Sequence, residues 1–457
     1  MSIKRWFRSI FEKPKPLGRE ILSKRIDNEE GNWRLHLRIE PNGEGVLIIN
    51  ASRVIHLNQT GAEIAKYIIE EKSPKDIIGI MTKRYRVSSD RVKKDIDRIT
   101  DLIEVMLKTD EICPITYLDV DRISPFTTPV SAPYRMDLAL TYRCQNNCEH
   151  CYVGRPKDME ELDTDKWKDI ITRLWEIGIP HLVFTGGEAT LRDDLIELVE
   201  WAENTGLVTG LNTNGRRLSD RELVRGLTDA GLDHVQITIE SHDKKIHDEM
   251  VGSEGAFDET VRGIKNAVEV PLYLVTNTTL TRMNTKNIKD TVKFVADLGV
   301  EVFACNGIIR SGEGKHYPYA LTEMELKKIL ERIINTANNL GLRLIWYTPT
   351  MYCKLNPIEM GLGVKSCTAG LYNMAIEPDG KVLPCQSYYK DVGNILKDEW
   401  ESIWNNELLN KIRSREYMPD MCSECEWREI CGAGCPLSLI EGDETVFCFE
   451  SGSNAPV

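Results

Sequence analysis

The sequence predicts an α/β protein whose largest part is a barrel, or part of a barrel, of parallel strands. From residue 134 to about residue 345, six strand-like runs alternate with helix-like stretches. Several of these helices begin at Asp, Ser or Asn and end at Gly, as capped helices do. Six strand–helix units in register place the strands inside and the helices outside. A smaller α+β pattern precedes this region, and a cysteine-rich stretch follows it.

We therefore divide the 457 residues into five segments. They are an N-terminal extension (1–32), a winged-helix-like α+β domain (33–110), a linker (111–133), the barrel (134–345) and a cysteine-rich domain (346–457). The linker carries prolines and no sustained period. The extension is basic with a few large apolar residues, which fits a frayed helix or, alternatively, a helix that docks on a partner or a membrane surface.

Composition and charge exclude several classes of protein. Hydrophobic residues make up 41% and charged residues 28%, as in globular proteins, and no apolar run is long enough to cross a membrane. The formal net charge of −13 argues against broad nucleic-acid binding, because an acidic surface repels phosphate. The N-terminus lacks the apolar core and cleavage site of a signal peptide. Thirteen cysteines without an export signal indicate metal or redox chemistry in the cytoplasm.

Residues 33–110 combine two strand-like runs, WRLHLRIE and GVLIINASRVIHL, with three helices. The first helix follows a cap at Asn58 or Thr60, the second begins at Ser73 and Pro74, and the third is the longest. A nucleic-acid-binding winged helix is the competing reading, but the basic residues of the third helix are matched by acidic ones. The basic residues are Arg91, Lys93, Lys94 and Arg98, and the acidic ones are Asp90, Asp95, Asp97, Asp101 and Glu104.

Polar motifs follow the predicted barrel strands at their carboxyl ends, where functional residues of such barrels gather. The stretch TYRCQNNCEHCYV follows the first strand, TGGE the second and NTNG the third. Glu240 and Ser241 follow the fourth strand, and Arg310 lies beyond the sixth. We expect these side chains to converge on one site.

The cysteines fall into two groups and two outliers. Cys113 and Cys305 stand alone, and we interpret both as structural, since small buried cysteines are common in strands such as VEVFACNG. The first group is Cys144, Cys148 and Cys151. The second group is Cys353, Cys367, Cys385, Cys422, Cys425, Cys431, Cys435 and Cys448. This partition predicts two metal-bearing modules separated by a scaffold.

Three closely spaced thiolates suit a [4Fe–4S] cluster that keeps one iron without a protein ligand. That iron can bind a small molecule. Zinc is the alternative, with His150 as a fourth ligand, because zinc needs a closed tetrahedral set. His150 is adjacent to Cys151, however, and neighbouring residues rarely reach one metal together.

The Cys-x3-Cys-x2-Cys spacing after a first barrel strand, with GGE after the second, resembles the radical S-adenosylmethionine (SAM) superfamily. The resemblance implies that Cys144, Cys148 and Cys151 hold the catalytic cluster, whose open iron is chelated by SAM. It assigns Gly186, Gly187 and Glu188 to the methionine amino group, for which a carboxylate is a suitable partner. Glu188 could instead serve only a helix N-terminus. Ala189 stands where the family commonly has Pro.

The same resemblance implies further cofactor contacts. His150 occupies the position whose side chain usually lies near the adenine, and Arg310 is a candidate for the carboxylate of the cofactor. The candidates for the ribose or nearby polar contacts are Asn212, Asn214, Glu240 and Ser241. Each of these residues could equally well cap the end of a strand.

The tail is similar to the SPASM subgroup of that superfamily, whose pattern of seven cysteines and one glycine it matches from Cys367 through Gly380 to Cys448. Two further [4Fe–4S] clusters are implied, which makes three in all. The nearer is assigned to Cys367, Cys385 and Cys435, and the farther to Cys422, Cys425, Cys431 and Cys448. Cys353 is the candidate for a fourth thiol of the nearer cluster, although its spacing is long. Paired zinc ribbons are the alternative for the tail.

The front domain resembles PqqD-type domains, which capture the leaders of ribosomally made, later-modified peptides, through LNQTG (57–61) and its helix order. The implied partner is a precursor peptide or protein whose extended leader joins the exposed sheet edge against the third helix. The implied activity is radical modification of that substrate, with a ferredoxin or flavodoxin as electron donor. Two alternatives stay open: a SPASM enzyme acting on a small molecule or on a heme-like, tungsten or molybdenum cofactor precursor, and a non-enzymatic zinc-binding regulator.

Overall fold

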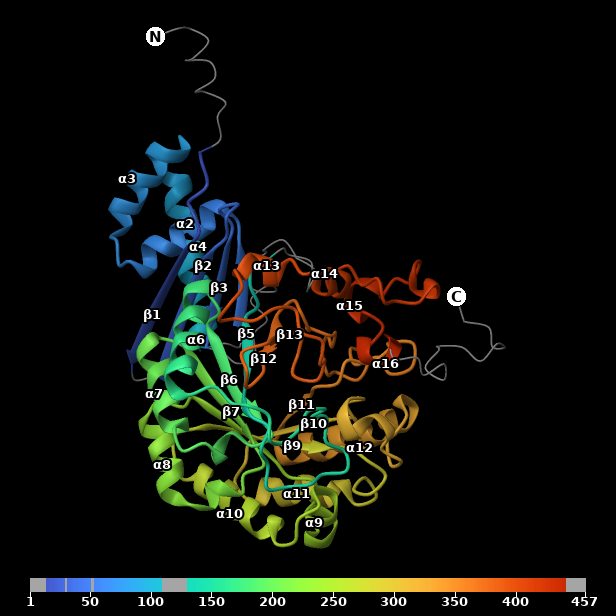
Figure 1. The fold of residues 1–457 in the computed structure, drawn as a ribbon. Helices are drawn as coiled ribbons and strands as arrows, with labels where there is room; N and C mark the ends of the chain where they lie inside the picture. Colours follow the sequence, from blue (N-terminus) through green and yellow to red (C-terminus); the bar gives the residue numbers. More distant parts are fainter. Residues whose placement is uncertain (1–13, 29–30, 51–52, 109–129, 441–457) are drawn as a thin grey trace, which may run out of the picture. The chain divides into compact units, whose positions relative to one another are not determined.

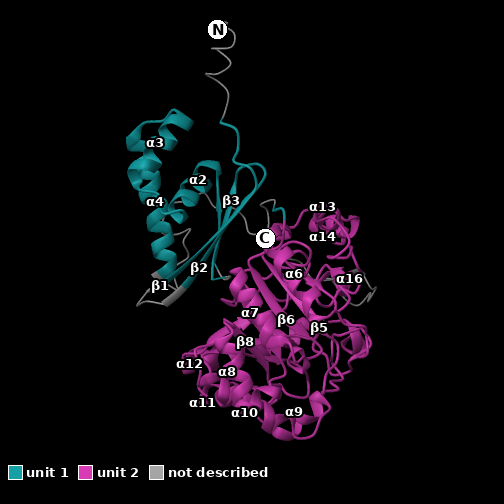
Figure 2. Ribbon diagram, turned by 60° about the vertical axis from the view of Figure 1, so that its left-hand side comes forward, with its two compact units in different colours: residues 1–123, 128–131 teal, residues 124–127, 132–457 magenta. Residues whose placement is uncertain are grey.

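The computed structural model describes residues 14–28, 31–50, 53–108 and 130–440 (Figure 1). The chain divides into two compact units, coloured separately in Figure 2. Unit 1 comprises residues 1–123 and 128–131, and unit 2 comprises residues 124–127 and 132–457. Among the helices of the described residues, none is both long and apolar enough to span a membrane. The expectation of a helix at the very N-terminus falls on residues 1–13, outside the described ones.

Unit 1 is a four-stranded antiparallel sheet with three helices, in the strand order β1-β2-β3-β4. Its elements are β1 (Glu20–Asn28), β2 (Gly31–Ile39), β3 (Gly45–Ile49), β4 (Arg53–Leu57), α2 (Gln59–Ile69), α3 (Pro74–Tyr85) and α4 (Ser89–Lys108). The expected cap residues are correct: Asn58 accepts a bond from the Gly61 amide, and Ser73 accepts one from the Asp76 amide. Strand β1 lies within residues 1–32, which the sequence predicts as an N-terminal extension without a strand.

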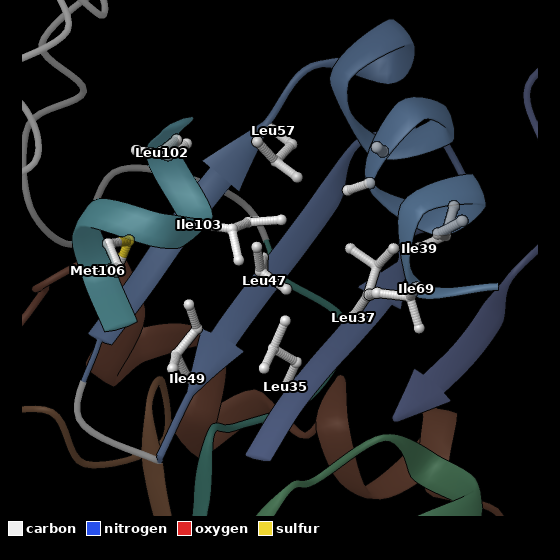
Figure 3. Close-up of a cluster of buried hydrophobic side chains, with 12 residues drawn as sticks. Leu35, Leu37, Ile39, Leu47, Ile49, Leu57, Ile69, Leu102, Ile103 and Met106 are labelled. Atoms are coloured by element: carbon white, nitrogen blue, oxygen red, sulfur yellow. The ribbon is translucent and has the colours of Figure 1, made fainter. Parts of the chain in front are cut away.

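The core of unit 1 lies between the sheet and helices α2 and α4 (Figure 3). Alternate residues of β2, namely Leu35, Leu37 and Ile39, point into this core and are at most 2% exposed. In Figure 3 the α4 side chains, among them Ile103, lie toward Leu57 of the edge strand β4. Helix α4 therefore flanks the β4 side of the sheet.

Unit 2 contains the predicted barrel strands as one sheet of order β11-β10-β9-β8-β7-β6-β5-β12-β13. The six predicted strands are β5 (Arg135–Thr141), β6 (His181–Gly186), β7 (Val208–Thr213), β8 (His234–Thr238), β9 (Tyr273–Thr279) and β10 (Val302–Asn306). Beyond them lie β11 (Arg343–Trp346), β12 (Asn373–Ile376) and β13 (Val382–Leu383). All neighbouring strands from β11 to β12 pair in parallel, so their carboxyl ends lie at one edge of the sheet.

Helices alternate with these strands as the sequence predicts (Figure 1). They are α6 (Thr164–Ile177), α7 (Leu195–Thr205), α8 (Arg221–Asp229), α9 (Lys244–Val251), α10 (Ala256–Val268), α11 (Ile288–Asp297) and α12 (Glu323–Leu340). Helix α6 shows the sequence logic: Asp163 caps its start, and Gly178, with φ +85°, ends it. The tail adds the short helices α13 (Trp400–Trp404), α14 (Glu407–Arg413), α15 (Arg428–Cys431) and α16 (Pro436–Ile440).

Candidate functional site

The three cysteines of the first group lie on the loop that leaves the carboxyl end of β5. Their thiols are partly buried, and burial is the main cause that raises the pKa of each one. Cys151 contributes to the raised pKa of both Cys144 and Cys148, so the three sulfurs lie close enough to interact. Thiols held in this way become thiolates when a positively charged metal group binds them.

The GGE motif packs backbone against backbone on the start of this loop. The amide of Gly187 donates to the carbonyl of Thr141 (2.8 Å), and the amide of Glu188 donates to the carbonyl of Arg143 (2.8 Å). A Cβ on Gly186, which has φ +135°, would lie 2.0 Å from the Thr141 carbonyl oxygen, and one on Gly187 would lie 2.4 Å from that of Tyr142. Both positions therefore require glycine.

Glu188 is 1% exposed, and both of its carboxylate oxygens accept hydrogen bonds. Oε1 accepts from the Thr190 amide and hydroxyl and from the Thr213 hydroxyl (3.1, 2.7 and 2.8 Å), and Oε2 accepts from the Asn214 amide (2.8 Å). Burial raises the pKa of this carboxyl, whereas these donors oppose the rise. Glu188 also caps the short 3-10 helix Ala189–Leu191. Glu188 therefore has the helix-terminus role that the sequence offered as an alternative. Its contact with the methionine amino group of SAM stays a prediction.

Asn214, from the NTNG motif, connects the third strand to the cysteine loop. Its side-chain nitrogen donates to the Cys144 sulfur (3.8 Å), and its oxygen accepts from Gln145 (3.3 Å). Sequence reasoning missed two cations that brace the same loop. Arg216 donates to the Asn146 side chain (2.8 Å), and Lys157 donates to the Asn146 carbonyl (2.8 Å). Neither residue stands in a motif that would have identified it.

His150 and Glu240 form a buried pair, although ninety positions separate them in the chain. The Nε2 atom of His150 lies 3.1 Å from Oε1 of Glu240, and the other oxygen of Glu240 accepts from the Thr279 amide (2.8 Å). The His150 ring lies edge-on to Tyr317, and its Nδ1 atom is buried without a hydrogen-bond partner. The pairing with Glu240 thus occupies one ring nitrogen of His150 and leaves Nδ1 open.

The remaining cofactor candidates lie at the carboxyl edge as expected, but not in one hydrogen-bonded group. Ser241 is buried and accepts from the Asp243 amide (3.0 Å), which is a strand-end capping role. Asn212 lies on β7, and Arg310 lies in the loop after β10. Their contact with a cofactor stays a prediction.

Neighbouring thiols in the tail form two sets, and their assignment to two clusters stays a prediction. The raised pKa of Cys367 is due to burial and then to Cys435 and Cys385, so these three thiols are neighbours. The raised pKa of Cys422 has burial as its main cause, followed by Cys425 and Cys431. Cys448 lies outside the described residues.

The backbone just before Cys353 contacts a cysteine of the second tail set. The amide of Tyr352 donates to the sulfur of Cys431 (3.4 Å), which places Cys353 one residue from the Cys422–Cys425–Cys431 set. The Cys353 side chain is exposed. Its role as a ligand stays untested.

The first cysteine loop and the tail are joined by side-chain hydrogen bonds and an ion pair. Tyr152, next to Cys151, donates to the side chain of Gln386, next to Cys385 (3.3 Å). Arg155 forms a two-pronged ion pair with the buried Glu377 (2.7 and 3.1 Å), which also accepts from Tyr142 (3.1 Å). These contacts fix the two cysteine-bearing regions of unit 2 relative to each other.

The donor sets fit iron–sulfur clusters better than single ions. Ten of the described cysteines are free thiols. Within the described residues, no three His, Cys, Asp or Glu side chains are grouped closely enough to hold one metal ion. In a cluster each thiolate binds its own iron, so the sulfurs are spread more widely than around one zinc.

Comparisons with known proteins agree with this organisation. Family models match in chain order: coenzyme PQQ synthesis protein D (PqqD) at residues 44–104, the radical SAM superfamily at residues 138–295 and an iron–sulfur cluster-binding domain (SPASM) at residues 367–426. The PqqA peptide cyclase of Bradyrhizobium diazoefficiens is 32% identical over 320 residues, which cover 66% of this chain and 81% of the cyclase. The AdoMet-dependent heme synthase of Methanosarcina barkeri is 28% identical, covering 67% of this chain and 91% of the synthase.

Among solved structures, the fold is similar to that of Streptococcus suis SuiB bound to the precursor peptide SuiA. The TM-score is 0.69, and the match covers 94% of this chain and 99% of SuiB at 17% sequence identity. At that identity the likeness concerns the fold alone.

Proposed function

Because the chain belongs to the radical SAM superfamily, in its SPASM subgroup, we propose that it modifies a ribosomally made peptide captured through its leader. The observation that carries this proposal is a PqqD-type domain ahead of a radical SAM barrel in one chain. The chain is thus a radical SAM enzyme that uses SAM and iron–sulfur clusters, and its substrate class is what we infer. The PqqA peptide cyclase of Bradyrhizobium diazoefficiens, a relative by sequence, supports that class.

In this proposal, Cys144, Cys148 and Cys151 hold the SAM-binding cluster, and the tail cysteines hold two more, for a total of three [4Fe–4S] clusters. With the cluster and SAM bound, the site would supply radical chemistry that can remove a hydrogen atom from the substrate. Glu188 would accept from the methionine ammonium, in addition to the donors that it already has. Glu240 fixes the His150 ring beside the position proposed for the adenine. The protein orients the reactants and excludes water.

The leader is proposed to add to the free edge of β4. Strand β4 is an edge of the unit 1 sheet, and α4 flanks that side of the sheet (Figure 3). An extended peptide gains main-chain hydrogen bonds at such an edge. The acidic residues of α4 favour a peptide over nucleic acid, as the sequence analysis expected. A ferredoxin or flavodoxin in a reducing cytoplasm would supply the electron, and the cysteines would remain thiols there.

A small-molecule substrate is the second candidate, because the heme synthase of Methanosarcina barkeri is also a relative. On that reading the front domain would dock a partner and not a leader. The front-domain match makes the peptide reading the stronger one.

Mass spectrometry tests the proposal directly. The anaerobically reconstituted chain, a reductant, SAM and a synthetic precursor peptide encoded beside this gene should yield a mass change in the peptide together with 5′-deoxyadenosine. Cys148→Ser should abolish both products while unit 1 still binds the leader. Cofactor cleavage without any change in the peptide would favour the small-molecule candidate. Continued 5′-deoxyadenosine formation by Cys148→Ser would contradict the assignment of the cysteine triplet.

A further inference from the structure

The loops that carry the two cysteine sets of the tail meet at Gly432. The first tail set is Cys367, Cys385 and Cys435, and the second tail set is Cys422, Cys425 and Cys431. Gly432 directly follows the last cysteine of the second set, and Ser366 directly precedes the first cysteine of the first set. A Cβ on Gly432 would lie only 2.9 Å from the Ser366 hydroxyl oxygen. The two loops are therefore in contact at this glycine.

Two further side chains reach the same point. The Tyr417 hydroxyl donates to the Gly432 carbonyl (3.1 Å). Cζ of Arg415 would lie 3.7 Å from a Cβ on Gly432. The Arg415 guanidinium is thus held between the two cysteine sets, where it also donates to the backbone carbonyl of Arg428.

Within the described residues, the Arg415 guanidinium has no carboxylate partner. Acidic side chains are nonetheless close to it in the chain. The adjacent Glu416 accepts from the Ser414 hydroxyl (2.9 Å), and Glu407 pairs with Lys411 (2.6 Å). A partly buried guanidinium is normally paired, so an anion is expected beside Arg415.

The thiols of the first tail set can supply this negative charge. Burial and the neighbouring thiols raise the pKa of Cys367, whereas the charge of Arg415 lowers it. Burial is also the main cause that raises the pKa of Tyr417, followed by Cys367, and Arg415 again opposes the rise. The guanidinium therefore lies close enough to Cys367 to stabilise its thiolate. Thiolates that hold an iron–sulfur cluster would give Arg415 its missing counter-ion.

Arg428 has the corresponding place beside the second tail set. Burial, then Cys425 and Cys431, raise the pKa of Cys422, and the charge of Arg428 lowers it. Arg428 is exposed, whereas Arg415 is partly buried, so water and salt screen the charge of Arg428 more strongly. The first tail set is therefore subject to the stronger positive field.

We propose that Arg415 is the counter-charge of the iron–sulfur cluster held by the first tail set, and that it raises the reduction potential of that cluster. This inference rests on the proposed function, which assigns a cluster to these cysteines. The potential of such a cluster depends on its net charge, its hydrogen bonds and its exposure. Reduction adds an electron and breaks no bond, so a fixed cation stabilises the reduced form. Arg415 thereby makes the first tail cluster the better electron acceptor of the two.

An anaerobic redox titration of the reconstituted full-length chain tests this proposal. Replacing Cys144, Cys148 and Cys151 by alanine removes the signal of the first cysteine loop. Arg415→Gly then removes the guanidinium at a φ of +60°, which suits glycine. At a fixed applied potential, the reduced-to-oxidised ratio of the first tail cluster should fall about 10-fold, or 59 mV for a one-electron couple. Arg415→Gln is the second variant should Arg415→Gly lose iron.

Three further variants define the controls. Arg415→Lys keeps the positive charge and should keep the ratio within about threefold of the unsubstituted protein. Lys411→Gln removes an equal charge from an exposed side chain that Glu407 already pairs, and should shift neither tail cluster. Arg428→Gln identifies the second tail cluster, because it removes the charge beside Cys422.

The outcomes separate this inference from the proposed function. A reconstituted chain whose tail binds no iron overturns both. Intact tail clusters whose ratios stay unchanged in Arg415→Gly and Arg415→Gln overturn only the role of Arg415. An equal fall in Arg415→Lys, or a shift confined to the cluster that Arg428→Gln also shifts, likewise overturns the inference alone.

Discussion

At Gly187 the chain carries glycine because two backbones approach too closely for a side chain. A Cβ there would lie 2.4 and 2.5 Å from the carbonyl oxygens of Tyr142 and Arg143, and neither backbone can rotate away as a side chain would. Gly187→Ala should therefore displace the start of the cysteine loop and destabilise the barrel by roughly 1–3 kcal/mol, as overpacking does. Anaerobic iron content and thermal unfolding would show the loss.

Gly79 provides the matched control for that substitution. It is exposed on helix α3, and a Cβ there would meet nothing within 4 Å. Gly79→Ala should keep the full iron content and stabilise unit 1 by about 0.5–1 kcal/mol, because alanine favours a helix. Equal iron content in the two variants would contradict the close-approach explanation for Gly187.

His234 gives the barrel a predictable acid sensitivity. Its Nε2 lies 2.8 Å from Nε2 of His181, and burial, followed by the charge of Arg135, lowers the pKa of His234 to about 4. Because this folded pKa lies below the unfolded value of 6.5, the contribution of His234 to stability is complete above about pH 6.5 and is lost as the pH falls toward 4. The loss can reach roughly 3 kcal/mol.

Thermal unfolding between pH 7 and pH 4 measures this effect. His234→Gln should be less stable than wild type at pH 7, and its stability should decline less steeply with acid. The wild-type and His234→Gln curves would run parallel if another group were responsible for the acid sensitivity.

Among the elements, β4 links the fold of unit 1 to its proposed task. In an antiparallel edge strand, alternate N–H groups point to the neighbouring strand and to solvent. Proline lacks an N–H group, so Val54→Pro and Ile55→Pro each remove one backbone N–H. One of these two N–H groups points to the neighbouring strand and the other to solvent. The variant that loses the outward N–H should bind the leader at least 10-fold more weakly with its sheet intact, because a main-chain hydrogen bond to the leader is gone. The variant that loses the inward N–H should destabilise the sheet.

Fluorescence anisotropy with a labelled leader, together with circular dichroism, separates these two effects. A charge-neutral substitution on β1, Ser23→Thr, is the control, because β1 is the opposite edge of the sheet. Leader binding that survives both proline variants would exclude β4 as the docking edge.

The sequence predicted the long elements well because their hydrophobic periods are strong. All six barrel strands and their capped helices lie where expected. Strand β1 was missed because its sequence, EILSKRIDN, is largely polar and carries four charged residues, as edge strands often do. Helix α9, with eight residues, and strand β11, with four, were not predicted either, because elements this short show no clear hydrophobic period.

The candidate site was predictable only where residues form a contiguous motif. The cysteine triplet, the GGE loop and NTNG are such motifs, and the structure places them around one loop. The His150–Glu240 pair joins positions ninety residues apart, and Arg216 reaches Asn146 across a similar interval. These contacts depend on the parallel register of the sheet, which no local spacing encodes.

At the scale of the whole molecule, the two cysteine regions of unit 2 are structurally coupled by contacts between their side chains. Tyr152 and Gln386 each follow a cysteine ligand candidate and contact each other, and the ion pair between the partly exposed Arg155 and the buried Glu377 lies beside them. Glu377→Gln removes the charge that the Arg155 guanidinium binds, while Arg155 can still reach water. The substitution should therefore lower the stability of unit 2 by roughly 1–2 kcal/mol and loosen both cysteine regions together. Loss of iron from one region alone would argue against that coupling.

Unit 1 has its own hydrophobic core, so the chain beginning at residue 130 should fold without it. If unit 1 only captures the leader, this shortened chain should still cleave SAM in the absence of peptide at a rate within about twofold of the full chain, since the proposed cluster ligands all lie in unit 2. Its KM for the precursor should rise about 100-fold, because a tethered leader gives the core peptide a millimolar effective concentration. Isolated unit 1 added at micromolar concentration should restore little, because the tether is lost. Kinetics with the full precursor and with a leaderless core peptide decide the matter: a shortened chain as efficient as the full chain on the precursor would show that recognition resides in the barrel alone.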